Sequence, residues 1–490
     1  MRSISSNCVV SRWLYLKMIA LVYLIAFGSL WIQIEGLVGS NGILPAGPFL
    51  ERASEIVGTE RFWRLPTLCW INASDAMLNG LCAGGSLLAI LLLADVAPAA
   101  CLFLMWGIYL SLSSIGGDFL SFQWDALLLE AGFLSMFLSP LHFRPASPVE
   151  SRWAGAGIWL LRWLLFRLMF SSGAVKLASG DPAWRNLTAL RYHYETQPLP
   201  TWIGWFAHQM PGWFQTFSVL IMFFVELVVP FFIFLPGILR RFAFFAITGL
   251  QLLIALTGNY CFFNLLTMSL CLLLLADSDW PGRWRRWIET RRRRSGAPRL
   301  VMWPAWILAP AAAATLLITG MLMLETLRLS VPWPAPIVAL YRLVVPFRSS
   351  NSYGLFAVMT TERPEIVVEG SNDGRSWLAY EFKWKPGDPH RRPGFVEPHQ
   401  PRLDWQMWFA ALGNYRDNQW FMQFLEQVMR GSPRVLALLE NNPFPNSPPR
   451  YVRAVVYQYH FTDLAALRSQ GTWWRREYRG PYCPTLSLSP

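Results

Sequence analysis

The sequence predicts a polytopic α-helical membrane bundle of about nine spans, followed by a soluble α+β domain that resembles a β-sandwich. Hydrophobic residues make up 54% of the 490 residues and charged residues only 15%, and the apolar residues are gathered into long runs. These runs end near residue 330, where alternating and turn-rich segments begin. We therefore divide the chain into a transmembrane domain, 1–330, and a β-rich domain outside the cytoplasm, 331–490.

Nine apolar segments approach the roughly 20 residues that a helix needs to cross a hydrocarbon core of about 30 Å. They lie near 13–33, 76–95, 98–115, 119–139, 156–178, 215–236, 238–256, 260–276 and 303–325. A chain with this pattern is a multi-pass protein whose surroundings are a lipid bilayer.

Short basic loops predict how the chain is oriented. Arginines occur at 144 and 152, at 240 and 241, and eight times between Arg283 and Arg299. With a cytoplasmic N terminus, all three loops fall on the cytoplasmic side, as the positive-inside rule requires. The segments 34–75 and 179–214 and the C-terminal domain then face outward. The net charge of +12 is thus a topology signal, and no nucleic-acid partner is expected.

The C-terminal domain shows strand and helix patterns in alternation. Strands are predicted at 351–359 and 451–461, and a hairpin at 365–383 whose turn contains Asn372, Asp373 and Gly374. Amphipathic helices are predicted at 403–412 and 418–429.

Charged residues inside the spans are the first candidates for a functional site, because a charge in a bilayer is costly and needs a partner. Arg162, Arg167 and Lys176 all lie in the span 156–178. Glu130 and Arg167 both fall near the midplane, so we expect them to pair. Glu226 has a similar depth, which predicts a cluster of Glu130, Arg167 and Glu226.

Two more carboxylates, Asp118 and Asp125, lie seven residues apart and would share one face of the span 119–139. Lys176 lies near the outer end of its span, within reach of Asp118. Such a lysine could extend its ammonium to the membrane surface, act as a catalytic base, or anchor a ligand. The Glu130–Arg167 pair could equally be structural.

Motifs of several enzyme classes are missing from the sequence. The six histidines show no HExxH or His-Cys ligand spacing, and neither a nucleophile elbow, a Walker loop nor a Rossmann glycine pattern occurs. We expect neither a metal nor a cofactor. Cys69 and Cys483 could form a disulfide if both face an oxidising compartment.

Several strings resemble the lipase maturation factor family, in order along most of the chain. They are Gly117–Phe133, Arg167–Leu190, Met359–Ile366, Glu369–Gly374, His399–Leu412 and Asn442-Pro-Phe. The resemblance implies a multi-pass membrane protein that helps secreted lipases reach their active form, in the endoplasmic reticulum membrane of animals. Bacterial members would lie in the inner membrane.

A shorter likeness concerns one lysine. Gly173-Ala-Val-Lys176-Leu with Asp181-Pro-Ala-Trp184 is similar to a region of vitamin K-dependent gamma-carboxylase and its membrane relatives. In those enzymes the lysine serves as a catalytic base.

Two functions follow from the sequence. In the first, which we favour, the protein is not an enzyme, and its C-terminal domain contacts a lipase or similar client. The candidate contact residues are Arg402, Asp404, Trp405 and Trp408, with Trp420, Trp473 and Trp474 as further aromatic anchors. In the second, the bundle is an enzyme that acts on a lipophilic substrate with Lys176 as base.

Overall fold

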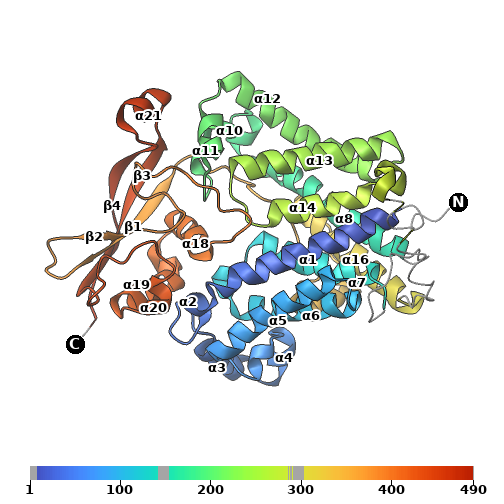
Figure 1. Cartoon of the computed structure of the whole chain (residues 1–490), viewed down its shortest axis with the longest axis horizontal. Helices are drawn as coiled ribbons and strands as arrows, with labels where there is room; N and C mark the ends of the chain where they lie inside the picture. Colours follow the sequence, from blue (N-terminus) through green and yellow to red (C-terminus); the bar gives the residue numbers. More distant parts are fainter. Residues whose placement is uncertain (1–7, 142–153, 285, 287–289, 291–302, 489–490) are drawn as a thin grey trace.

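The computed structural model describes residues 8–141, 154–284, 286, 290 and 303–488. A helical bundle carries the C-terminal domain at one end, and the first helix begins at the opposite end (Figure 1). The arginines at 144 and 152 and most of the arginines between 283 and 299 lie outside the described residues.

The described residues contain seven helical segments that are long and apolar enough to cross a membrane, which confirms a multi-pass bundle. They are α1 (Val9–Trp31), α5 (Asp75–Leu93), α6 (Pro98–Ile115), α8 (Ala154–Ala178), α12 (Gly212–Phe223) with its continuation to Phe234, α13 (Ile238–Thr257) and α16 (Ala305–Thr326). The continuation of α12 consists of a π-helical turn, η5 (Phe224–Val228), and a 3-10 segment, η6 (Val229–Phe234).

The other two predicted spans are shorter than expected, so the count of nine is approximate. The fourth begins as a 3-10 turn, η4 (Gly117–Leu120), and continues after a break as α7 (Gln123–Leu138). The eighth is α14 (Phe263–Cys271) with η7 (Leu272–Leu274). At 1.5 Å per residue, neither α7 nor α14 reaches 30 Å. Both are mostly buried among the longer helices.

Short segments connect the long helices. Between α1 and α5 lie α2 (Ile34–Val38), α3 (Ala46–Val57), η2 (Gly58–Glu60), α4 (Arg61–Arg64) and η3 (Leu68–Trp70). Between α8 and α12 lie α9 (Pro182–Arg185), α10 (Leu190–Thr196) and α11 (Trp202–His208), and after α16 come α17 (Ala335–Val344) and η9 (Val345–Phe347). At the other end of the bundle, η8 (Asp277–Asp279) caps the N-terminus of α1. The Asp277 carboxylate accepts hydrogen bonds from the amides of Val9 and Val10 at 3.0 and 2.8 Å.

The C-terminal domain contains one antiparallel sheet in the order β2-β1-β3-β4. The strands are β1 (Pro364–Ser371), β2 (Leu378–Tyr380), β3 (Tyr451–Phe461) and β4 (Trp474–Leu486), with Val367 opposite Val455 and Val368 opposite Tyr380. The helical segments are α18 (Arg402–Ala411), η10 (Tyr415–Asp417), α19 (Gln419–Met429), α20 (Pro433–Leu436) and α21 (Leu464–Gln470).

The α+β class, the hairpin, both amphipathic helices and the strand 451–461 are confirmed. The domain differs from a β-sandwich, because its described residues form a single four-stranded sheet. The predicted strand 351–359 is wrong: this segment has no strand partner, and its polar groups bond to the bundle instead. All seven cysteines are free and buried, so Cys69 and Cys483 do not form a disulfide.

Candidate functional site

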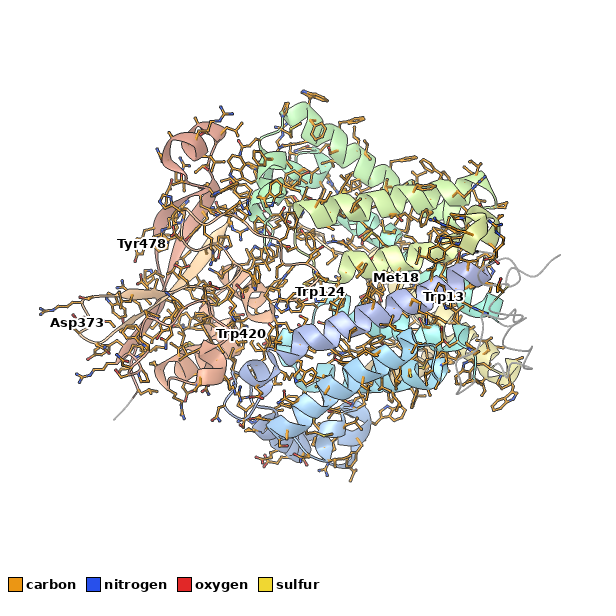
Figure 2. All side chains as sticks on the ribbon, in the orientation of Figure 1. Trp13, Met18, Trp124, Asp373, Trp420 and Tyr478 are labelled. Atoms are coloured by element: carbon orange, nitrogen blue, oxygen red, sulfur yellow. The ribbon has the colours of Figure 1, made fainter. Side chains whose placement is uncertain are left out.

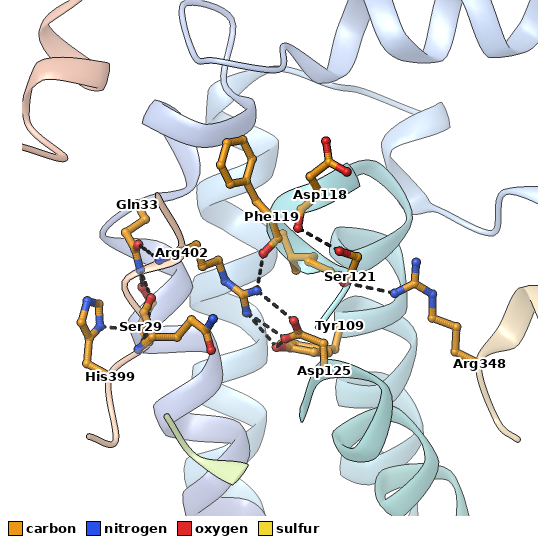
Figure 3. Close-up of polar contacts among 12 residues, drawn as sticks. Ser29, Gln33, Tyr109, Asp118, Phe119, Ser121, Asp125, Arg348, His399 and Arg402 are labelled. Carbon is orange, nitrogen blue, oxygen red and sulfur yellow. Dashed lines mark hydrogen bonds and ion pairs between the residues drawn. The ribbon is translucent and has the colours of Figure 1, made fainter. Parts of the chain in front are cut away.

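A buried arginine of the C-terminal domain reaches into the bundle. Arg402, at the start of α18, binds both carboxylate oxygens of Asp125 on α7, at 2.8 and 2.9 Å. The same guanidinium donates to the Phe119 carbonyl at 2.5 Å and to the Tyr109 hydroxyl at 3.2 Å, and Tyr109 donates to Asp125 (Figure 3). The arginine and the aspartate are only 1% and 0% exposed. A bidentate pair of this kind fixes both distance and angle between the two domains.

The segment that leads to Arg402 is bonded to α1 (Figure 3). Ser29 accepts from the Gln400 amide at 2.9 Å, and its hydroxyl lies 2.8 Å from Nδ1 of His399. Gln33 accepts from the Arg402 amide at 2.9 Å and donates to the Gln400 carbonyl at 2.8 Å. Backbone polar groups that would otherwise be unpaired in a buried loop are thereby satisfied.

Glu130 and Arg167 form the expected ion pair between α7 and α8, and both are buried. The pair also binds the segment after η9. Glu130 accepts from the Asn351 amide at 2.9 Å and from the Tyr353 hydroxyl at 2.8 Å, while Arg167 donates to the Asn351 carbonyl at 2.9 Å. The pair therefore also anchors the chain that leads into the C-terminal domain.

The predicted cluster of Glu130, Arg167 and Glu226 is wrong, because Glu226 binds Lys176 instead. The predicted contact between Asp118 and Lys176 is also wrong. Asp118 lies on η4 with an exposed side chain, whereas Asp125 lies on α7, so the two do not share a helix face. The break at Ser121 and Phe122 separates them.

Burial contradicts the expectation that four C-terminal residues are exposed for client contact. Arg402, Asp404, Trp405 and Trp408 are all buried. Asp404 accepts from the amides of Trp384 and Lys385, Trp405 packs on Trp124 of α7, and Trp408 donates to the Thr196 carbonyl at 2.8 Å. Arg402, Trp405 and Trp408 thus hold the two domains together, whereas Asp404 is bonded within the C-terminal domain. Of the further tryptophans, Trp420 and Trp474 are buried and Trp473 is half-buried.

Lys176 on α8 and Glu226 in η5 form a second buried ion pair. The ammonium lies 2.9 and 2.7 Å from the two carboxylate oxygens and 5.3 Å from the ring centre of Trp184. Glu226 lies in the π-helical turn η5, a feature often found at functional sites. Gly173 permits this approach, because a Cβ there would lie 2.9 Å from the Cβ of Glu226.

The ion pair borders a cavity of about 460 Å³ between α8, α12, α13 and α14. Apolar side chains form most of its wall, and Lys176, Glu226, His193, Gln251 and Asn264 contribute polar groups. Leu355 and Phe356, from the segment that enters the C-terminal domain, cover one side. The Phe356 carbonyl accepts from the Trp184 indole at 2.9 Å. No group of three or more potential metal ligands occurs within the described ranges.

Glu397, a carboxylate of the C-terminal domain, is bonded to two residues that line this cavity, Tyr260 and Asn264. It accepts from the Tyr260 amide and, at 3.2 Å, from the Asn264 side chain. Burial raises the pKa of Glu397 to about 8, although these two hydrogen bonds oppose the shift. No sequence pattern identifies Glu397, because it follows a loop without hydrophobic periodicity.

Both domains of the chain match one known family. The profile for the lipase maturation factor transmembrane domain matches residues 10–282, and that for the lipase maturation factor C-terminal domain matches 349–484. The chain belongs to the lipase maturation factor family. Human lipase maturation factor 2 is 37% identical over 97% of this chain and 82% of its own length. The Xenopus tropicalis lipase maturation factor 2 is 35% identical over 95% and 81%, and human lipase maturation factor 1 is 34% identical over 98% and 88%. No solved structure matches this family member.

Replacing Lys176 by Met should destabilise this lipase maturation factor homologue by about 3 to 5 kcal/mol, because Glu226 would remain as a buried unpaired charge. The double variant Lys176→Met/Glu226→Leu should recover most of that loss, since it removes both charges. Chemical unfolding of the purified protein measures both values. Equal stability of the single variant and the unaltered chain would contradict the pairing.

Glu397 should make stability depend on pH. Its folded pKa of about 8 exceeds the ordinary value of about 4.3, so between these values the folded state holds a proton that the unfolded state lacks. The free energy of unfolding therefore falls as pH rises through this window. Glu397→Gln keeps an acceptor for Tyr260 and should lose less stability between pH 5.5 and 8.5. Identical pH slopes in thermal unfolding would show that Glu397 is not the titrating group.

Proposed function

We propose that this protein assists the maturation of secreted lipases or similar clients from the outer side of its membrane. The observation that carries the proposal is the match of both domains, in order, to proteins named lipase maturation factor. The chain covers at least 81% of these relatives' length. The client is thus proposed from the relatives' names, and the site of action from the arrangement of the two domains.

We propose that the N terminus is cytoplasmic and the C-terminal domain lies across the membrane, in the endoplasmic reticulum of a eukaryotic host or the inner membrane of a bacterium. Two features support this orientation. The start of α1 and the C-terminal domain lie at opposite ends of the bundle (Figure 1). Arg240 and Arg241 lie at the start of α13, and Arg241 is 3.7 Å from Asp279 of η8, which closes the α1 end. Basic residues at that end favour the cytoplasm.

The orientation predicts glycosylation in a eukaryotic host. Asn72 and Asn186 are exposed acceptor sites in segments that lie on the side of the C-terminal domain. Both should carry glycans, so that Asn72→Gln and Asn186→Gln each increase gel mobility and enzymatic deglycosylation abolishes the difference. An acceptor tag fused before residue 1 should stay unmodified. Glycosylation of the tag, with Asn72 and Asn186 unmodified, would show the opposite orientation and contradict the proposal.

We propose the outward face of the sheet as the client surface, in place of the buried residues around Arg402. Tyr478 on β4 is 60% exposed and lies far from the bundle (Figure 2). Its ring centre is 5.5 Å from that of Tyr457 on β3, and Arg476 stacks on Tyr457 at 4.8 Å. Beside them, Arg453 stacks on Trp377 at 4.1 Å. Tyrosine, tryptophan and arginine dominate the binding energy of protein interfaces.

Lipase rescue tests the proposed function. In cells that lack their own maturation factor, the unaltered chain should restore the specific activity of a secreted lipase, measured per amount of lipase protein. Tyr457→Ala/Tyr478→Ala should reduce this rescue at least about tenfold, a loss of roughly 1.4 kcal/mol of client binding. Tyr192→Ala changes another exposed tyrosine, on α10, and should rescue normally. No rescue by the unaltered chain, at normal membrane levels, would overturn the proposal.

The alternative of an enzyme with Lys176 as base is not favoured by these contacts. The Lys176 amine is held by both oxygens of Glu226 and is not free to accept a proton from a substrate. The charge-free variant Lys176→Met/Glu226→Leu should therefore retain lipase rescue. Loss of rescue in this variant at unchanged stability would instead favour the enzyme.

A further inference from the structure

The cavity beside Lys176 opens sideways to the lipid-facing surface. Phe217 and Ile221 on α12 and Leu253 on α13 line the cavity and are 54%, 45% and 60% exposed. Both helices belong to the membrane-spanning set and present exposed apolar faces. Such faces lie against acyl chains when a helix spans a bilayer. A lipid chain can therefore enter the cavity between α12 and α13 without passing through water.

The size and lining of the cavity are those of a ligand site. Its volume of about 460 Å³ lies within the range of roughly 300 to 1,000 Å³ that is usual for small-molecule pockets. A mostly apolar wall with a few convergent polar groups is typical of such pockets. Here the polar residues Lys176, Gln251 and Asn264, on α8, α13 and α14, are buried, in contrast to the exposed apolar residues of the mouth.

Two polar side chains in the wall have buried oxygens without a hydrogen-bond partner among the described residues. They are Oδ1 of Asn264 and Oε1 of Gln251, on side chains that are 1% and 3% exposed. The Asn264 nitrogen donates to Glu397, which fixes the amide so that its oxygen is the unpaired atom. Buried acceptors of this kind are rare because they are costly. A ligand hydroxyl is the group that would satisfy them.

The charges of the wall indicate a neutral head group. Lys176 and Glu226 neutralise each other at 2.7 and 2.9 Å, so the wall offers no unbalanced cation to a carboxylate or phosphate. A fatty-acid anion would place a negative charge next to Glu226 and next to the unpaired amide oxygens of Asn264 and Gln251. A neutral hydroxyl donates to those oxygens at no such cost.

We propose that this cavity binds a neutral single-chain lipid whose head group carries free hydroxyls, of the monoacylglycerol class. The acyl chain lies between α12 and α13, and the two free hydroxyls of the head group donate one to Asn264 and the other to Gln251. This site is separate from the sheet face proposed for client contact. Its test measures binding, so its failure is distinguishable from a failure of lipase rescue.

Photolabelling tests the site in the full chain reconstituted in lipid nanodiscs. The probe is monooleoylglycerol with a diazirine in the acyl chain, and mass spectrometry maps the labelled peptides. We expect labels concentrated in the segments 214–221 and 250–254. Unlabelled monooleoylglycerol should compete at least about tenfold better than oleic acid or methyl oleate, which share the chain but lack the hydroxyls.

Matched variants separate the mouth from the polar end. Leu253→Trp, in the mouth, should reduce labelling several-fold, whereas Leu252→Trp should not, because Leu252 is similarly exposed but does not line the cavity. Asn264→Leu should keep the labelling but remove the preference for hydroxyls. If Asn264→Leu does not fold, Gln251→Leu takes its place. Labels spread evenly over the lipid-facing helices, or equal competition by methyl oleate, would overturn the proposal.

Discussion

The pairing of charge inside the bundle is the constraint on which the structure depends. Three buried carboxylates each have one cationic partner. Asp125 pairs with Arg402, Glu130 with Arg167, and Glu226 with Lys176. A buried charge that loses its partner costs several kcal/mol. Two of these cations come from the bundle itself, but Asp125 is paired only when the C-terminal domain inserts α18. The bundle is therefore complete only with the C-terminal domain in place.

This arrangement assigns different roles to the two sides of the C-terminal domain. Its inner side, with Arg402, Trp405 and Trp408, is buried against the bundle. On its other side, the sheet carries the exposed side chain of Tyr478, far from the bundle (Figure 2). In the proposed function, the bundle holds the C-terminal domain at a fixed distance from the membrane, and the domain presents this sheet face to the client. The cavity proposed to bind lipid has Phe356, from the segment that enters the C-terminal domain, in its wall.

Much of the fold was predictable because length and hydropathy are local properties. Seven spans and the elements at 403–412, 418–429 and 451–461 follow from such patterns, and depth alone predicts the Glu130–Arg167 pair. The partner of Asp125 is 277 residues away, on a helix whose pattern is that of a soluble domain, so no local signal identifies it. Glu226 lies in a π-helical turn, which adds a residue and so shifts side-chain directions by about 100° from the α-helical period; that period therefore does not predict its contact with Lys176.

The docking of the C-terminal domain through Asp125 and Arg402 can be tested most directly with a double-mutant cycle. The free energy of unfolding would be measured for the unaltered protein, Asp125→Leu, Arg402→Met and the double variant. We expect each single variant to lose about 3 to 5 kcal/mol, and the double variant to lose less than the sum by more than about 1 kcal/mol. Losses that add within about 0.5 kcal/mol would show that the two residues are not coupled and would contradict the docking role of the pair.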